Sequence, residues 1–446
     1  MSVDTIVSVS ITRKTKYPSR KGFGTAMLLV SKVPTSWGTK KKETYGNTLT
    51  ELTDDGFLVT DPAYLMAQIL LAQNPTIKSF KVAKRTLPPT KSIKLTVTNA
   101  TEGYVYNFKV NGTAITYTVP AAQTTTQVAT ALELLIEAVT DITSSSAANV
   151  ITMGAPAGTL IDVENWIGTD NDVPGGDSGM LLEDATTDPG IATDLAAVYA
   201  MDSDWYAIVV DSMGKLEAAA ASTWAEANKI LLMVDAADSE IWDSGDTNDA
   251  VSVAKAASQF RTCYWVSNTK LLHWTSCGIL GSRLTKDPGS DTWKFKTLSN
   301  VTPAQFTEGE KTAIHNKNGN TYTTVGGLTI TEEGKTAGGE FADIMRFSDW
   351  LQAEIQTDVY ATLANAEKLP FTDAGADVLK GVVSSVLNRG VRVGGLANDP
   401  APSVDAPLVS TVSAGNKAAR NYPDITFLGT FAGAIHFVGI SGTIGV

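Results

Sequence analysis

The sequence WYAIVVDSMGKLEAAAASTWAEANKILLMV, residues 205–234, decides the fold class of this chain. It begins and ends with continuous apolar runs, at 205–210 and 230–234, and an alanine-rich segment suited to a helix joins them. Strands that are apolar on both sides are typical of a sheet covered by helices on both faces, with parallel strand pairs. The stretch therefore predicts an α/β sheet.

The same alternation continues on both sides of this stretch. Residues 23–30 form another apolar run, and Thr60-Asp61-Pro62 predicts a helix start because proline suits the first helical position. A further helix and strand pattern follows, ending at Val266. We therefore expect one α/β core that comprises residues 23–86 and 193–395.

Residues 87–192 interrupt this core with a different pattern. Leu87-Pro88-Pro89-Thr90 marks the boundary, and period-two alternation follows it. Asn111-Gly112 lies between two alternating segments, which predicts a β-hairpin. We expect an inserted β-rich domain, so that the fold class is a mixed α/β (α+β) core with an insertion and with extended β-strand arms at both ends.

Two helices are predicted late in the core. Apolar residues between Phe341 and Leu363 recur every three or four positions. Thr372-Asp373 predicts the start of the second helix, and Gly390 predicts its end.

Both ends of the chain have strand-like patterns. Residues 1–22 combine an alternating segment with basic residues, and the last 22 residues, 425–446, contain no charged side chain. We expect an N-terminal strand arm at 1–22 and a linker with a strand arm at 396–446. An apolar terminal strand pairs either within its own sheet or with a neighbouring copy. The residues predicted to pair with a neighbour are Val3, Thr5, Val7, Val9, Ile11, Phe437, Val438, Ile440, Ile444 and Val446.

A membrane anchor is the competing interpretation of residues 425–446, because about 20 apolar residues span a bilayer. Five glycines and an alternating pattern favour extended strands instead. We therefore expect no membrane anchor. The alternative function that remains open is a surface-exposed or membrane-anchored binding protein that uses the β-rich module 87–192.

Charge is unevenly distributed along the chain, whose formal net charge is -12. Residues 1–94 hold 15 basic and 6 acidic side chains, whereas residues 130–260 hold 3 basic and 23 acidic ones. Such a dipolar chain suits charge-complementary stacking of copies, and a solvated acidic domain beside a basic one is the other interpretation. The basic part lacks a compact stripe with stacking aromatics, so we expect no nucleic-acid partner.

Motifs for enzymatic chemistry are incomplete. Gly334-Lys335-Thr336 resembles the end of a phosphate loop, but Thr329 occupies the position of the required earlier glycine. Gly176-Asp177-Ser178-Gly179 resembles a protease nucleophile motif, but all three histidines lie downstream of it. Cys263 and Cys277 are not in a metal-binding spacing. We therefore expect no enzyme, no cofactor and no metal site.

Several motifs in the second half, taken in their order and spacing, resemble the contractile tail sheath proteins of myovirus-type bacteriophages. They are DPGSDTWKFK (287–296), VTP (301–303), NKNGNTY (316–322), EGK (333–335), GGEFAD (338–343), RFSDWL (346–351) and KLPFTDAG (368–375).

This resemblance implies a mechanical function. It implies a virion structural subunit that is assembled in the host cytoplasm and forms stacked, usually hexameric rings around a tail tube. Contraction would drive the tube through the host envelope. The implied partners are further copies of the chain, the tail tube protein, and baseplate and tail terminator proteins. Termini of adjacent subunits would complete a β-sheet in a neighbour, and the inserted domain would face outward.

The resemblance also implies a surface that faces the tube. Its candidates are the helix 372–389 and the loop 389–392, with Lys380, Arg389 and Arg392 as the contacting residues. The two arginines have a second interpretation, because cations at a helix C-terminus complement the helix dipole.

Overall fold

A computed structural model describes residues 22–156, 158–166, 179–187 and 190–442 of the chain. These residues divide into two compact units. One unit holds Gly22–Arg346 together with the chain from Ala434 onward, and the other holds Phe347–Gly433. Each unit is described below by itself.

The first unit contains an eight-stranded sheet in the order β15-β14-β13-β12-β11-β1-β3-β2. Neighbouring strands from β14 to β3 are parallel, and the two edge strands β15 and β2 are antiparallel to their neighbours. The predicted α/β sheet with parallel pairs is therefore confirmed. Its strands are β1 (Ala26–Val30), β2 (Lys42–Tyr45), β3 (Phe80–Lys84), β11 (Ala207–Val210), β12 (Leu231–Ala236), β13 (Thr262–Val266), β14 (Asn320–Val325) and β15 (Leu328–Glu332).

Helices cover both faces of this sheet. Successive side chains of β1 alternate between two hydrophobic clusters, with Leu28 in one and Met27 in the other. The first cluster includes α2 (Pro62–Leu71) and α7 (Thr275–Arg283), and the second includes α4 (Ile191–Met201), α5 (Lys215–Asn228) and α6 (Ala250–Ala256). Further helices of this unit are η2 (Thr35–Trp37), α1 (Thr50–Asp54), η3 (Ser239–Trp242) and α8 (Glu308–Asn316).

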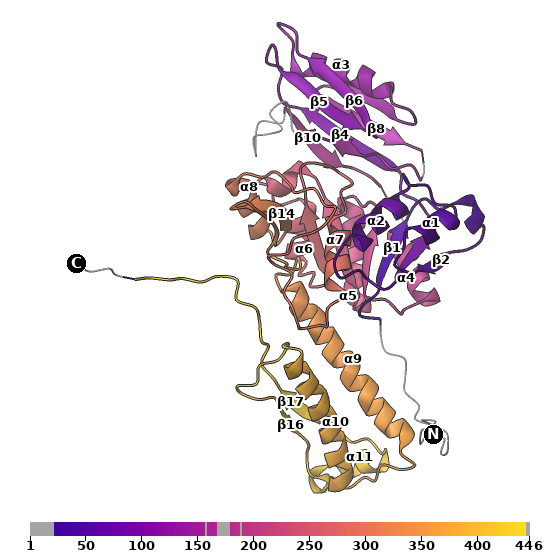
Figure 1. Ribbon diagram of the computed structural model, residues 1–446, viewed down its shortest axis with the longest axis vertical. Helices are drawn as coiled ribbons and strands as arrows, with labels where there is room; N and C mark the ends of the chain where they lie inside the picture. The colour runs from indigo at the N-terminus through magenta and orange to yellow at the C-terminus, as the bar shows by residue number, and fades with distance from the viewer. Residues whose placement is uncertain (1–21, 157, 167–178, 188–189, 443–446) are drawn as a thin grey trace, which may run out of the picture. The chain divides into compact units, whose positions relative to one another are not determined.

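The described residues between 91 and 184 form two further sheets, drawn in purple to magenta in Figure 1. One has the order β10-β4-β8-β7 and the other β6-β5-β9, and the helix α3 packs with them around a separate hydrophobic cluster. The predicted hairpin turn is confirmed, because Asn111 and Gly112 both have positive φ between β5 and β6. The elements are β4 (Lys91–Val97), β5 (Val105–Val110), β6 (Thr113–Thr118), α3 (Thr125–Glu137), β7 (Thr143–Ala147), β8 (Val150–Ala155), β9 (Val163–Glu164) and β10 (Met180–Asp184).

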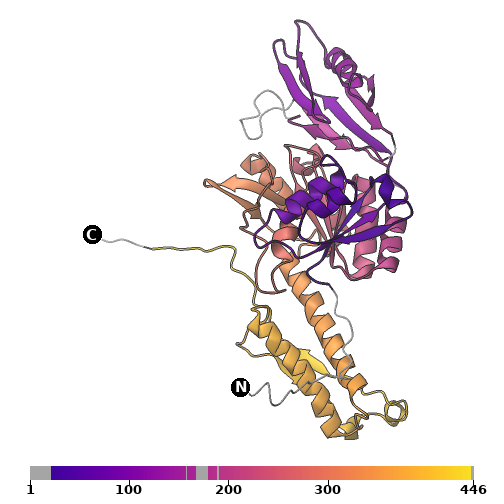
Figure 2. The same ribbon diagram turned by 45° about the vertical axis from the view of Figure 1, so that its right-hand side comes forward.

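The second unit is built on two helices, most of α9 (Ala342–Asn365) and α10 (Asp373–Arg392). Figures 1 and 2 both show α9 and α10 side by side. Phe347 of α9 and Leu387 of α10 share a small hydrophobic cluster between them. The rest of the unit holds β16 (Ser403–Asp405), η4 (Val409–Thr411), α11 (Ala414–Ala418) and β17 (Thr426–Leu428).

The predicted end of the second helix was wrong. Thr372 caps α10 as expected, but the helix continues through Gly390 to Arg392, so residues 389–392 are not a loop. Gly390 is buried, and a Cβ there would lie 3.2 Å from the Phe347 ring and 3.1 Å from Leu396. Its missing side chain therefore serves close packing. Gly394, with φ +87°, follows the helix in the left-handed conformation that suits glycine.

Candidate inter-subunit surfaces

The last described residues, 434–442, have no helix or strand and are called the C-terminal arm here. Figure 1 draws this arm as an extended yellow segment. Its apolar side chains are largely in solvent: Phe437 is 82% exposed, Val438 74% and Ile440 91%. Consecutive exposed apolar side chains on an extended segment are typical of a surface that binds a partner.

The residues predicted to pair with a neighbour divide into two groups. Phe437, Val438 and Ile440 lie on the C-terminal arm and are exposed. The N-terminal residues Val3, Thr5, Val7, Val9 and Ile11, and the last residues Ile444 and Val446, lie outside the described residues. Pairing with a neighbour stays a prediction for both groups.

A two-stranded sheet in the second unit offers open edges. β16 and β17 pair antiparallel, with Val404 opposite Phe427, and no third strand pairs with them among the residues that the structure describes. Val404 packs against the hydrophobic cluster of α9 and α10, whereas Leu428 is 72% exposed. A two-stranded sheet is stabilised by additional strands, so this one is suited to accept a strand from outside.

The three residues predicted to face the tube all lie on α10, but in different environments. One guanidinium nitrogen of Arg389, Nη2, lies 2.9 Å from Glu354 Oε2 and 2.7 Å from Asp358 Oδ2, both on α9. This ion pair links the two helices, a role that the sequence did not predict. Lys380 is half-buried and Arg392 is exposed.

Residues of the quoted motifs meet around β15 in the first unit. Thr331 donates its backbone N–H to the carbonyl of Lys296, and Phe295 donates its N–H to the carbonyl of Thr331, at 2.9 and 2.8 Å. Glu333 lies 2.8 Å from Lys294 and 2.6 Å from Lys335. Burial opposes its ionisation, but the hydrogen bonds from both lysines prevail and lower the pKa of Glu333 to about 2.

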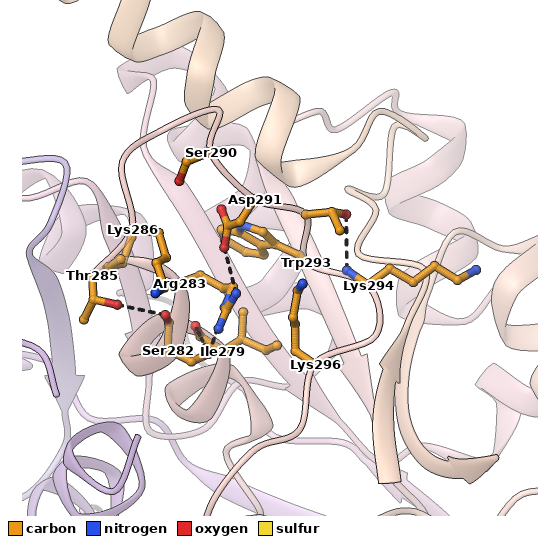
Figure 3. A network of polar contacts seen from close by, with 12 residues as sticks. Ile279, Ser282, Arg283, Thr285, Lys286, Ser290, Asp291, Trp293, Lys294 and Lys296 are labelled. Carbon is orange, nitrogen blue, oxygen red and sulfur yellow. Dashed lines mark hydrogen bonds and ion pairs between the residues drawn. The ribbon is translucent and has the colours of Figure 1, made fainter. Parts of the chain in front are cut away.

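The DPGSDTWKFK segment is fastened to α7 as well. Figure 3 shows the Arg283 side chain directed at Asp291, and their nearest atoms are 2.7 Å apart. Arg346 at the start of α9 is only 2% exposed and donates to the backbone carbonyls of Phe23 at 3.2 Å and Lys286 at 2.8 Å. These contacts give the segment a fixed conformation.

A buried acidic cluster lies at the carboxyl ends of β11 and β12. Asp184, Asp211, Asp235 and Asp238 line a cavity of about 20 Å³. Burial raises the pKa of Asp235 to about 7, and burial together with Asp184 raises the pKa of Asp238 to about 8. Across the described part of the chain, no group of three His, Cys, Asp or Glu side chains is placed to hold a metal ion.

The two cysteines and the helices bear on the predictions about a metal site and a membrane anchor. Cys263 and Cys277 are free and buried, and burial raises the pKa of both thiols, which makes them unreactive. Within the described ranges, none of the helices combines the length and the apolar character needed to cross a membrane.

Comparison with solved structures identifies the class of fold. The sheath protein in "Cryo-EM Structure of an Extracellular Contractile Injection System, PVC sheath complex in contracted state" aligns with 98% of this chain and 96% of its own at 10% identity, with a TM-score of 0.51. A chain of the anti-feeding prophage (AFP) baseplate, 6-fold symmetrised, aligns with 58% of this chain and 73% of its own at 12% identity, with a TM-score of 0.45. The first likeness shows that this chain shares a contractile sheath fold.

A family comparison is more specific for one segment. Residues 342–400, which include α9 and α10, match the family described as "E217 tail sheath protein gp31-like, C-terminal domain". A search of curated proteins finds no match for the chain. The resemblance to contractile tail sheath proteins that the motifs indicated is therefore confirmed.

Proposed function

We propose that this protein is a structural subunit of a contractile phage tail sheath that polymerises around a tail tube. The observation that carries the proposal is the match of residues 342–400 to a tail sheath C-terminal domain, within a chain whose fold aligns with a sheath protein over 98% of its length. The function is mechanical, and no catalytic step is assigned to any residue.

The C-terminal arm and the β16–β17 sheet are the proposed means of polymerisation. The arm of one subunit adds as a strand to an open edge of β16–β17 in a neighbour, where backbone hydrogen bonds join the subunits. The N-terminal strand at Val3–Ile11 is a second donor. Because the C-terminal arm is an extended segment, neighbours stay connected while the bodies change their packing during contraction.

The remaining surfaces have proposed roles that follow from the same function. The exposed side of α10, with Arg392 and the half-buried Lys380, faces the tail tube, while the Arg389 ion pair holds α9 and α10 together. The β-rich segment 87–192 is an inserted domain that faces outward. The assembly is a homo-oligomer of stacked rings, hexameric as in the resembling family, which engages a baseplate and a tail terminator.

Negative-stain electron microscopy of the purified chain tests the proposal. We expect rings or tubes from the intact protein. Deletion of residues 438–446 should leave the subunit folded, because β17 and the arm's first residues remain. The truncated subunit should not polymerise, because it lacks the strand that it would donate. The matched control replaces 438–446 by a glycine-serine segment of equal length, which also fails to polymerise if apolar strand contacts are required. A truncated protein that still forms tubes, or an intact one that remains monomeric at high concentration, contradicts the proposal.

A further inference from the structure

The C-terminal arm touches the body of the protein at one place. His436 is half-buried, whereas every other described arm residue is exposed. Its Nε2 lies 2.9 Å from the hydroxyl oxygen of Thr292, which is hydrogen-bond distance. The His436 ring also meets the ring of Phe341 edge-on, with ring centroids 4.8 Å apart.

The next arm residue makes a second type of contact. The ammonium group of Lys294 lies 4.7 Å from the centre of the Phe437 ring, within the range of a cation–π interaction. Lys294 is itself 6% exposed and is held by its ion pair with Glu333. The cation that meets Phe437 is therefore fixed in position before the arm arrives.

The backbone at this contact is in an unfavourable conformation. Phe295 has φ +63°, a left-handed conformation that bulky residues rarely adopt. Its neighbours Trp293 and Lys294 are buried, but its own ring is 48% exposed, and its ring centroid lies 6.1 Å from that of His436. Strained residues of this kind gather at sites that hold a ligand or a segment of chain.

We infer that Thr292, Lys294, Phe295 and Phe341 form an arm-binding surface that fixes the C-terminal arm to its own subunit at His436 and Phe437. Only the residues after Phe437 are then free to pair with a neighbour. For this consequence the inference rests on the proposed function. Because the arm is fixed at His436 and Phe437, the donated strand can begin only after Phe437. This restriction lowers the conformational entropy that the strand loses when it pairs with a neighbour.

The charges around His436 make this attachment sensitive to acid. The groups that act on the ring are Lys294, Lys296, Lys335 and Glu333, so cations outnumber the single carboxylate. Burial and Lys294 lower the pKa of His436 below 6.5. The pKa of His436 is therefore lower in the attached arm than in a free arm. Attachment is strongest above pH 6.5, where the ring is neutral in both states, and it weakens as pH falls below that value.

A nitroxide label at position 435, directly before His436, measures the attachment. The label is placed through Ile435→Cys in the full chain, at a position that is 80% exposed, and the buried thiols of Cys263 and Cys277 do not compete for it. Spectra are recorded at concentrations below any assembly. We expect an immobilised arm in the parent protein and an about fivefold larger mobile-to-immobile ratio in His436→Ala, the effect of losing one hydrogen bond.

A second variant and a control distinguish loss of the hydrogen bond between Thr292 and His436 from an effect that any substitution in the arm would have. Thr292→Val is expected to shift the ratio in the same direction, and combining it with His436→Ala adds little, because both remove the same hydrogen bond. Ile440→Ala, at a position that is 91% exposed, leaves the ratio unchanged. Acidification from pH 7.5 to 5 raises the mobile fraction in the parent but not in His436→Ala.

Three outcomes would overturn the inference. One is an unchanged spectrum in His436→Ala, and the second is the absence of the acid response in the parent protein. The third is immobilisation that appears only at concentrations at which the protein assembles. That result would mean that the arm of a neighbour occupies this surface. Failure of the intact chain to polymerise contradicts the proposed function but leaves these single-subunit measurements interpretable.

Discussion

At the scale of single residues, Arg346 shows how a sheath motif stabilises the fold. It belongs to the RFSDWL motif, and its buried guanidinium donates to backbone carbonyls of residues 23, 283, 284 and 286. The sequence did not predict this role, because the acceptors are carbonyl groups, which every residue carries. Only the tertiary structure brings these particular carbonyls together.

Arg346→Ala is expected to lower stability strongly, because it leaves several buried carbonyls without donors. Each unsatisfied buried group costs about 1–3 kcal/mol, so we expect a loss of at least that size and a fall of several degrees in the melting temperature measured by calorimetry. The control is Arg420→Ala, at an exposed position. A melting temperature equal to that of the control would contradict the assigned role.

The buried acids Asp235 and Asp238 predict a pH dependence of stability. Their pKa values in the folded protein are about 7 and about 8, above the ordinary value of 3.8. Between pH 3.8 and about pH 8, the folded protein therefore binds more protons than the unfolded chain. Stability is therefore highest near pH 4 with respect to these groups and declines as pH rises to about 8.

Asp238→Asn tests this directly. The amide oxygen can still accept the hydrogen bond that Asp184 N–H donates to Asp238 Oδ1 at 2.5 Å, and the repulsion from the other acids is removed. We expect a melting temperature above that of the parent at pH 8 and equal to it near pH 4, measured by differential scanning calorimetry. Asp54→Asn, at an exposed position, serves as the control, and a pH-independent difference would argue against the mechanism.

At the scale of elements, two glycines of α10 have opposite roles. Gly390 lies against Phe347 and Leu396, whereas a Cβ at Gly381 would meet no atom within 4 Å. We expect Gly390→Val to destabilise by about 1–3 kcal/mol through overpacking and Gly381→Ala to stabilise by about 0.5–1 kcal/mol through helix propensity. Thermal unfolding of the full chain measures both, and a stable Gly390→Val variant would contradict the packing argument.

The exposed residue Leu428 of β17 tests the proposed strand acceptor. Leu428→Lys places a charge where an added strand would bury it, so we expect loss of tubes in electron microscopy with an unchanged melting temperature. Leu408→Lys is the matched control, because Leu408 is 60% exposed in the same unit but lies outside the β16–β17 sheet. Normal tubes from Leu428→Lys would show that this sheet does not accept a strand in the way proposed.

At the scale of the whole molecule, the separation of charge along the chain predicts how assembly responds to salt. Residues 1–94 carry a net +9 and residues 130–260 a net -20. If stacked copies place these parts opposite each other, screening weakens the attraction, because the Debye length falls from about 10 Å at 0.1 M to about 3 Å at 1 M salt.

We therefore expect the concentration needed for polymerisation to rise with sodium chloride, as measured by light scattering. Sucrose at matched osmolality is the control for effects of the solute on hydration. Polymerisation that is promoted by salt would indicate instead that apolar arm contacts dominate assembly.

The extent of successful prediction differs between the parts of the molecule. The parallel sheet, the helix that starts at Pro62, the Asn111-Gly112 turn and the start of α10 were predicted, because each depends on side-chain periodicity or on a cap within a few residues. The end of α10 was predicted wrongly, because Gly390 is used for packing against residues that lie elsewhere in the chain.

The sequence by itself determined the class of the fold and the resemblance to sheath proteins, because both depend on patterns that are local or on the order of motifs. The tertiary structure alone decided which partners the motif residues have: Glu333 between two lysines, Arg389 on the acids of α9, and His436 beside Thr292. The physical reason is that side-chain periodicity acts between neighbours along the chain, whereas ion pairs and close contacts depend on packing between residues that are distant in sequence.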